Sequence, residues 1–287
     1  MPEFGKVCIV GVGLLGGSIA RVIKKKHLAD EVVGFGRNLK NLELAKFLGV
    51  VDGFSQDLGE AVKDADLVIF CSPVGSIIPR LVESLPHLKA GCLLTDVGSV
   101  KASIVNAIDE LLPERLHFIG SHPIAGSEKT GVEASSDDLF CGARCIVTPT
   151  EKSQPEALES LRRFWQDIGM AVDCMSAEEH DLILGAVSHL PHIIAFALIN
   201  TLSAVKTENC SDVSAFSGKG LKDSSRIAAS DPVMWRDICI HNKSALLNLI
   251  DEFQASLQQT RSWIEDQQFD SLEDSFRSAQ ERRINLT

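Results

Sequence analysis

The feature that most constrains the fold is a glycine loop near the start of the chain, Gly11-Val-Gly13-Leu-Leu-Gly16. It follows an apolar run over residues 6–10 that predicts a buried strand, and it opens a segment with helical periodicity. In this setting the first glycine permits a tight turn, the second lets backbone approach a pyrophosphate, and the third lets the helix pack closely on the strand. The helix N-terminus then faces the phosphate charge. We therefore predict a dinucleotide site that uses Gly11, Gly13, Leu14, Leu15 and Gly16; the alternative is a turn that serves only close packing.

Short apolar strands alternate with amphipathic helices through the first half of the chain. The strands are predicted at residues 6–10, 31–35, 66–71, 92–96, 117–120 and 144–148, and the helices between them at 16–25, 41–48, 76–85 and 103–112. Alternation of this kind gives a parallel sheet with helices on both faces. The predicted fold class is therefore α/β, with a doubly wound sheet of Rossmann type.

The pattern changes in the second half. After a helix at 155–168 and a short strand at 171–175, no convincing strand follows, and helices are predicted at 178–190, 193–202, 231–259 and 271–283. We therefore predict two domains: a dinucleotide-binding domain over residues 1–175 and an all-helical domain over residues 176–287.

Charge and cysteine usage exclude several classes of protein. The chain of 287 residues carries a formal net charge of -11, which disfavours nucleic-acid binding and requires local cations for any anionic substrate. The 8 cysteines form no CxxC pair, so we predict no metal site and a reduced, cytoplasmic setting. The N-terminus enters a strand at once, which predicts no signal peptide. We find no apolar stretch of about 20 residues and predict no membrane partner.

The end of the second predicted strand bears on the choice of cofactor. NAD sites usually carry Asp or Glu there for the ribose hydroxyls, but this chain has Gly36-Arg37-Asn38. Because Arg37 could pair with a 2'-phosphate, NADP is favoured over NAD. The alternative is that Arg37 is solvated or stacks on adenine, with NAD as cofactor. Further cofactor contacts are predicted after the third and fourth strands, at Ser72, Pro73 and Asp96, where ordinary turn chemistry is the alternative.

Four further segments carry a family resemblance. They are DVGSVK (96–101), GSHPIAGSEKTG (120–131), VSHLPH (187–192) and DSSRIAASDPVMWRD (223–237), and in this order they resemble the prephenate and arogenate dehydrogenases of tyrosine biosynthesis. The resemblance implies a Rossmann domain followed by a helical dimerisation domain, and hence a homodimer. It also implies an oxidative decarboxylation, in which a hydroxycyclohexadiene carboxylate gives hydride to the nicotinamide, loses carbon dioxide and becomes aromatic. The preference between prephenate and arogenate stays open.

The resemblance also implies roles for single residues. His122 would be the catalytic base that takes the ring hydroxyl proton, a task that suits an imidazole with an ordinary pKa of about 6.5. Ser99 would orient that histidine, and Arg226 would hold a substrate carboxylate through its guanidinium fork. The alternatives are a structural histidine and a helix-surface ion pair.

Further substrate contacts are implied with weaker support. The residues are Ser127, Glu128, Ser188, His192, Lys222 and Trp235. For Glu128 and Lys222 a solvated side chain is nearly as good an interpretation, and for Trp235 the alternative is plain core packing. His189 is interpreted as a structural histidine with its hydrogen bonds satisfied. Two other functions stay open: a dehydrogenase of the beta-hydroxyacid type and a nucleotide-sensing module without turnover.

Overall fold

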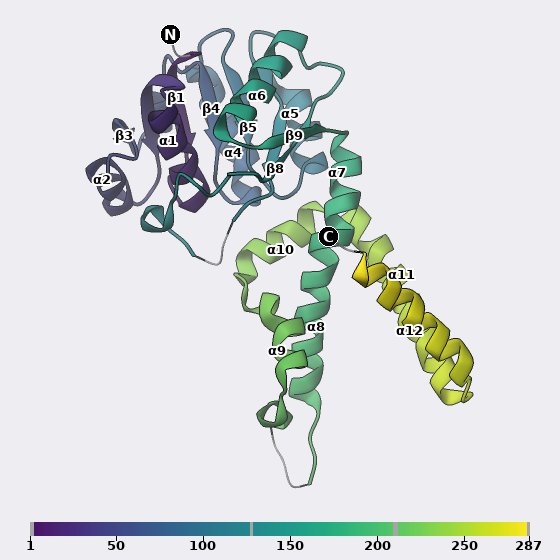
Figure 1. The fold of residues 1–287 in the computed structure, drawn as a ribbon. Coiled ribbons are helices and arrows are strands. Elements are labelled where there is room, and N and C mark those ends of the chain that lie inside the picture. Colours follow the sequence, from purple (N-terminus) through teal and green to yellow (C-terminus); the bar gives the residue numbers. More distant parts are fainter. Residues whose placement is uncertain (1–2, 127–128, 209–211, 286–287) are drawn as a thin grey trace. The chain divides into compact units, whose positions relative to one another are not determined.

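The computed structural model describes residues 3–126, 129–208 and 212–285. The chain divides into two compact units, Met1–Asn242 and Lys243–Thr287, and both are seen in Figure 1. The first unit holds both sheets and most of the helices, and the second is a pair of helices. The predicted domain division near Ser176 is a different partition, and it stays a prediction.

The first unit is built on a six-stranded parallel sheet. Its strands are β1 (Phe4–Val10), β2 (Ala29–Phe35), β3 (Gly53–Ser55), β4 (Leu67–Phe70), β5 (Leu93–Asp96) and β6 (His117–Phe118). Their order across the sheet is β3-β2-β1-β4-β5-β6, and every pairing is parallel. This is the strand order of a doubly wound dinucleotide-binding fold, so the predicted fold class is confirmed.

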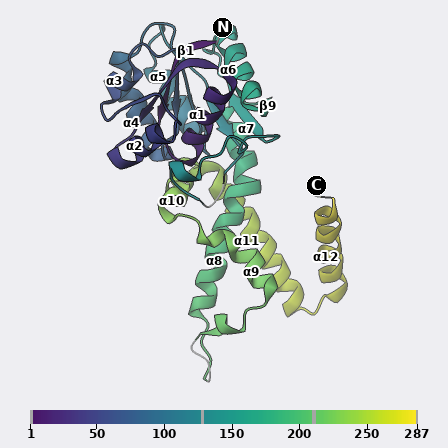
Figure 2. The same cartoon turned by 60° about the vertical axis from the view of Figure 1, so that its left-hand side comes forward.

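Helices cover both faces of this sheet, as Figures 1 and 2 show from two sides. Side chains of α1 (Leu14–Lys26), α2 (Leu39–Phe47) and α6 (Pro155–Ile168) belong to one apolar core, and those of α3 (Leu58–Val62), α4 (Val74–Ser84) and α5 (Ala102–Leu111) to the other. The central strand shows why two cores form. Val7 and Ile9 of β1 point into the first core, whereas Cys8 and Val10 point into the second, as the two-residue period of a strand requires.

A second, three-stranded sheet adjoins the first. It contains β7 (Gly120–Pro123), β8 (Arg144–Thr148) and β9 (Ala171–Cys174), with β7 antiparallel to β8 and β8 parallel to β9. The prediction of one strand over residues 117–120 was therefore wrong, because the chain leaves the first sheet at Ile119 and starts a new one. A hydrogen bond of 2.7 Å between the hydroxyls of Thr95 and Ser121 joins β5 to β7.

A continuous helical segment then runs from Ala177 to Ala204. It consists of α7 (Ala177–Leu184), a π-helical turn (Gly185–His189) and α8 (Leu190–Ala204). Ser176 caps its start by accepting a hydrogen bond of 3.1 Å from the backbone amide of Glu179. Two separate helices were predicted here. The wide π turn instead accommodates Pro191, which has no N–H and would clash with a carbonyl of a regular helix.

This segment corrects one sequence-based expectation. Its 28 residues are long and apolar enough to cross a membrane by length and composition, whereas no such stretch was expected. Its first two turns nevertheless contact protein, because His180 and Asp181 are buried and hydrogen-bonded to residues of the α/β core.

The remaining helices are shorter or lie in the second unit. In the first unit, α9 (Lys219–Ser225) lies beside α8 and α10 (Pro232–His241) packs on α4. The second unit holds α11 (Lys243–Glu265) and α12 (Phe269–Ile284), joined by a turn at Gln267. The 3-10 turns are Leu85–His87, Val132–Ala134, Val213–Phe216 and Arg226–Ala229.

The single helix predicted over residues 231–259 is interrupted at Asn242. The side-chain amide of Asn242 donates a 2.8 Å hydrogen bond to the carbonyl of Asp181 and lies 3.0 Å from Nδ1 of His189. Both contacts hold Asn242 against the segment Ala177–Ala204, at the point where the predicted helix breaks.

Candidate active site

The glycine loop has the geometry that its sequence predicts. Gly11 has a φ of 105°, and a Cβ placed on it would lie 2.8 Å from the carbonyl oxygen of Cys71. A Cβ on Gly16 would lie 2.2 Å from the carbonyl oxygen of Gly11, so only glycine lets α1 pack this closely. A Cβ on Gly13 would meet nothing within 4 Å, so this position faces open space. The first and third glycines are therefore required by packing, and the second leaves room for a ligand.

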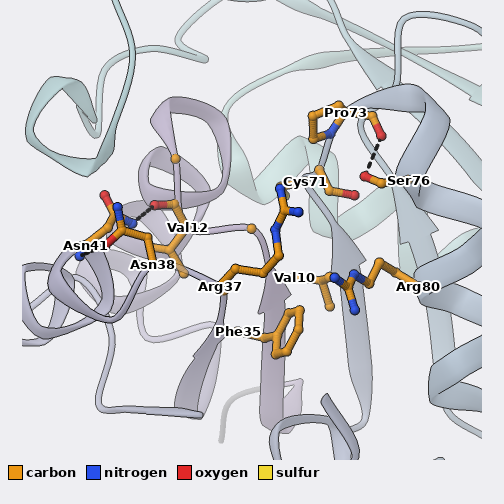
Figure 3. Close-up of a pocket in the computed structure, with 14 residues that line it drawn as sticks. Val10, Val12, Phe35, Arg37, Asn38, Asn41, Cys71, Pro73, Ser76 and Arg80 are labelled. Atoms are coloured by element: carbon orange, nitrogen blue, oxygen red, sulfur yellow. Dashed lines mark hydrogen bonds between the residues drawn. The ribbon is translucent and has the colours of Figure 1, made fainter. Parts of the chain in front are cut away.

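That open space is a cavity of ≈ 650 Å³ at the carboxyl ends of β1, β2 and β4 (Figure 3). It lies where the strand order reverses between β1 and β4, which is where doubly wound sheets bind dinucleotides. The amides at the start of α1 have no partner within the helix and can face phosphate oxygens there. The lining includes the predicted cofactor residues Gly11, Gly13, Arg37, Ser72 and Pro73. The cavity thus fits a nicotinamide dinucleotide.

Two arginines line this cavity, and Figure 3 shows their side chains on either side of the Phe35 ring. Arg37 follows β2, as predicted, whereas Arg80 of α4 has no counterpart in the sequence-based prediction. The guanidinium of Arg80 lies 5.4 Å from the ring centre of Phe35 and pairs with Glu83 at 2.5 Å. None of the described lining residues is acidic. The cavity therefore presents cations and no carboxylate at the end of β2.

Asp96, a predicted cofactor contact, is held by other groups of the protein. Its side chain is 0% exposed, and its carboxylate forms an ion pair with Nζ of the equally buried Lys101. It also accepts hydrogen bonds from the backbone amides of Gly98 at 2.8 Å and Ser121 at 3.2 Å. Its carboxylate oxygens are thus used within the protein, and a contact between Asp96 and the cofactor stays a prediction.

His122 lies on β7 and is buried. Its Nδ1 is 2.8 Å from Nε2 of His180, and Nδ1 of His180 is 2.8 Å from the carboxylate of Asp181. Burial holds the pKa of His122 well below its ordinary value, and the neighbouring His180 and Lys101 act in the same direction. The imidazole is therefore neutral at pH 7, as a resting proton acceptor must be.

The predicted hydrogen bond from Ser99 to His122 is not among those of the described residues. His122 is bonded to His180 instead. The backbone of Ser99 instead lies near His189, where it acts to raise the pKa of that imidazole. His189 is buried and lies 3.0 Å from the side-chain amide of Asn242, and burial lowers its pKa to about 4. His189 is thus the satisfied structural histidine that the sequence suggests.

His192 and Trp235 form a stacked pair. Their ring centres are 3.7 Å apart with an interplanar angle of 21°, and Nδ1 of His192 donates to the carbonyl of Ser188 at 2.8 Å. This bond leaves Nε2 of the neutral imidazole as a hydrogen-bond acceptor. Burial lowers the pKa of His192, and the nearby cation of Arg226 lowers it further. The structure therefore brings His192, Trp235 and Arg226 into one region of the helical part.

The other predicted substrate residues differ in their surroundings. Arg226 and Lys222 are exposed, and neither forms an ion pair with any residue that the structure describes. Lys222 lines a separate hollow between α8 and α9, together with Ile199 and Leu221. Ser127 and Glu128 lie outside the described residues. Within the part of the chain that the structure describes, Arg226 is therefore a cation without an ion-pair partner, near enough to His192 to lower its pKa.

Comparisons with known proteins agree with this arrangement. The family description "Prephenate dehydrogenase, nucleotide-binding domain" matches residues 19–173, and "Prephenate dehydrogenase, dimerization domain" matches residues 176–278. The prephenate dehydrogenase of Bacillus subtilis is 37% identical over 283 residues, which cover 98% of this chain and 76% of the relative. The cyclohexadienyl dehydrogenase of Zymomonas mobilis is 34% identical over 287 residues, covering 100% and 97%.

A solved structure gives the same result at the level of the fold. The prephenate dehydrogenase from A. aeolicus, in complex with hydroxyphenyl propionate and NAD+, superposes with a TM-score of 0.92 at 36% identity, covering 99% of this chain and 98% of that one. Strand order, glycine geometry and sequence identity thus point in one direction. The chain belongs to the prephenate dehydrogenase family of oxidoreductases.

Proposed function

We propose that this chain catalyses the oxidative decarboxylation of prephenate, arogenate or both, giving 4-hydroxyphenylpyruvate or tyrosine in tyrosine biosynthesis. Family membership supports the reaction class, and the buried, neutral His122 is the observation that carries it. A bound nicotinamide supplies the hydride acceptor. The chain must then supply a proton acceptor for the ring hydroxyl and cations for the carboxylate groups.

In this proposal His122 is the proton acceptor. With Nδ1 engaged by His180, Nε2 is the nitrogen left to take the hydroxyl proton as the C–H bond breaks. The ring carbon becomes a carbonyl, the carboxylate leaves as carbon dioxide, and its bonding electrons make the ring aromatic. Those electrons turn the carbonyl into a phenolate, and the imidazolium of His122 returns the proton to it, which gives the phenol of the product.

Arg226 is proposed to hold a substrate carboxylate. Its guanidinium is free of ion pairs within the described part of the chain, and it lies near enough to His192 to lower the pKa of that imidazole. The stacked Trp235 fixes the plane of His192, whose Nε2 faces no partner among the described residues. Ser188, Lys222 and, beyond the described residues, Ser127 and Glu128 are proposed as further substrate contacts.

Substitution of Arg226 tests this assignment. We expect Arg226→Met to raise KM for the substrate by about 10- to 100-fold, because a charge-assisted hydrogen bond contributes about 1.5–3 kcal/mol. Arg226→Lys should recover only part of the loss, since lysine keeps the charge but not the fork. Steady-state kinetics at saturating cofactor measure the effect. Arg236→Met is the matched control: Arg236 is already paired with Asp237 at 2.6 Å. A KM for Arg226→Met within about twofold of wild type would contradict the assignment.

For the cofactor we propose NADP in preference to NAD. The support is Arg37 at the end of β2, the second cation of Arg80 and the absence of an acidic side chain among the described residues of the cavity lining. A carboxylate there would bind the ribose hydroxyls of NAD and repel a 2'-phosphate. The relative from A. aeolicus holds NAD+, so the two cofactors must be compared directly.

Substitution of Arg37 separates the two cofactors. Arg37→Ala should lower kcat/KM for NADP by about tenfold, the effect of losing one exposed charge-assisted hydrogen bond to phosphate. With NAD the change should stay below about threefold, because no 2'-phosphate is present. Lys40→Ala, an exposed cation of α2 outside the cavity lining, is the control. Equal losses with both cofactors would show that Arg37 does not read the 2'-phosphate.

The proposed function as a whole is tested by assaying prephenate and arogenate, each with NAD and with NADP. We expect the highest kcat/KM with NADP and one or both of these substrates. Turnover of a beta-hydroxyacid with neither of them active would overturn the proposal. The same assay settles the substrate preference, which depends on a keto or amino group in the side chain.

We also propose that the chain acts as a cytoplasmic homodimer. The match to a dimerization domain over residues 176–278 supports the dimer. Within that range, only 22% of the most apolar stretch of helix Ala177–Ala204 is buried inside one chain. A second copy that covers this helix would remove its apolar surface from water.

A further inference from the structure

Three buried side chains form a hydrogen-bonded series that ends at His122, the proposed base. The carboxylate of Asp181 is 2.8 Å from Nδ1 of His180, and Nε2 of His180 is 2.8 Å from Nδ1 of His122. His180 is 0% exposed, Asp181 4% and His122 9%, so bulk water does not compete for these bonds. His180 and Asp181, which are adjacent in α7, therefore form one hydrogen-bonded series with His122 on β7. His122 lies 58 positions before His180 in the sequence.

The carboxylate of Asp181, the acceptor at one end of this series, fixes the position of each proton along it. Asp181 accepts from the backbone amides of Lys101 at 2.7 Å and Ala102 at 2.9 Å, at the start of α5. A carboxylate held by two amide donors has only acceptor capacity left, so Nδ1 of His180 must carry its proton. In the neutral ring Nε2 of His180 is then an acceptor, and Nδ1 of His122 must be the donor.

The consequence for His122 is a single tautomer. Its proton lies on Nδ1, and the lone pair lies on Nε2. The opposite tautomer would place two lone pairs face to face between the histidines or leave Nδ1 of His180 without a proton to give Asp181. Each alternative would leave a buried polar atom without its bond, at a cost of about 1–3 kcal/mol.

We propose that His180, held by Asp181, is a positioning residue that fixes the tautomer of His122 and so presents Nε2 as the proton acceptor. This inference deepens the proposed function and rests on it. When Nε2 takes the hydroxyl proton, Nδ1–H of His122 continues to donate to His180, and no proton transfer to His180 is needed. The Asp181 carboxylate, two hydrogen bonds away, favours the imidazolium, whereas the buried Lys101 cation opposes it.

The alternative is that His180 only helps α7 pack against β7. Both interpretations predict a lower kcat when His180 is removed. The test must therefore show whether the loss of kcat depends on His122. Substitution by leucine removes the acceptor at Nε2. Substitution by glutamine keeps an amide oxygen within reach of Nδ1–H of His122.

In the wild-type background we expect His180→Leu to lower kcat by about 100-fold, while KM for the cofactor changes by less than about twofold. His180→Gln should retain at least about ten times the kcat of His180→Leu. The matched control is His241→Leu: this histidine also reaches α5, with Nδ1 3.1 Å from the hydroxyl of Ser103, but it has no bond to His122. Its kcat should stay within about twofold of wild type. Equal kcat values for the Leu and Gln variants would contradict a role as acceptor.

A double variant decides between positioning and packing. If His180 acts through His122, then adding His180→Leu to His122→Asn should lower kcat by less than about threefold. The reason is that the effects of residues that act as a unit are non-additive. If His180 serves only packing, its full loss of about 100-fold should multiply with that of His122→Asn. A multiplicative loss would overturn the inference.

The same experiments distinguish this inference from the proposed function. A nearly normal kcat for His122→Asn alone would refute the assignment of the base, and with it both ideas. A strong loss for His122→Asn together with normal turnover for His180→Leu would refute only the positioning role.

Discussion

Replacing His122 with asparagine should lower kcat by about three orders of magnitude, within the 10²–10⁴ range of a general base. Asparagine has no basic lone pair, but its side-chain N–H can still donate to Nε2 of His180, so the buried contact survives. The cavity beside the glycine loop is lined by other residues. We therefore expect KM for the nicotinamide cofactor to change by less than about twofold.

The control for this prediction is a second change of histidine to asparagine. His27 lies at the end of α1 with a φ of 51°, a left-handed conformation that asparagine tolerates, and it is far along the helix from the glycine loop. His27→Asn should keep wild-type kcat. If His122→Asn also turned over at nearly the wild-type rate, His122 would not be the base.

The pH dependence follows from the same group. Burial lowers the pKa of His122, so the neutral, proton-accepting form is fully present above its ordinary pKa of about 6.5 and is lost as the pH falls through the lowered value. The kcat/KM of the wild type should accordingly decline only on acidification below about pH 6.5.

Replacing Lys101 with methionine should destabilise the folded protein by about 3–5 kcal/mol, the cost of leaving one member of a buried ion pair alone. Lys101 and Asp96 are both 0% exposed, and the ammonium also donates to the carbonyl of Ser121 at 2.8 Å. Methionine fills a similar volume without a charge. The Asp96 carboxylate would keep two backbone amides but lose its cation. The free energy of unfolding in urea measures the change.

Two further variants show whether the charge is responsible. Asp96→Asn combined with Lys101→Met removes both charges and should recover at least half of the loss. Arg144→Met breaks an ion pair with Asp173 that is largely exposed, at 69% and 41%, and should cost less than about 1 kcal/mol. A loss below about 1 kcal/mol for Lys101→Met would mean that the buried pair adds little to stability.

The first half of the fold could be predicted because its signals are local. The run at residues 6–10 and the glycines after it determine a strand, a turn and a helix over a short stretch of chain. The structure gives Gly11 the positive φ of a tight turn, packs Gly16 closely against the loop and leaves open space at Gly13, as the spacing indicates. By contrast, β3 and α3 were missed because Gly53–Ser55 and Leu58–Val62 are too short to show a period.

Breaks between elements could not be predicted where distant residues cause them. The helix over residues 231–259 has continuous apolar periodicity, but Asn242 interrupts it by bonding to Asp181. The strand over residues 117–120 divides at Ile119 because the chain crosses to a second sheet, where Ser121 bonds to Thr95. Neither partner is recognisable from the local sequence.

The same limit applies to the site. Roles could be predicted for His122, Arg226 and Arg37 because motifs surround them. His180 has no such signal, since its partner lies on another element and a lone histidine in a helix is usually structural. The burial of Asp96 against Lys101 could not be predicted either, because it depends on packing.

The most direct test of the account is the stoichiometry of the reaction. The purified chain is supplied with prephenate or arogenate and NADP or NAD, and reduced cofactor and released carbon dioxide are both quantified. We predict equal amounts of the two products, with formation of the aromatic compound. Reduced cofactor without carbon dioxide, or no turnover of either substrate, would contradict the proposed oxidative decarboxylation.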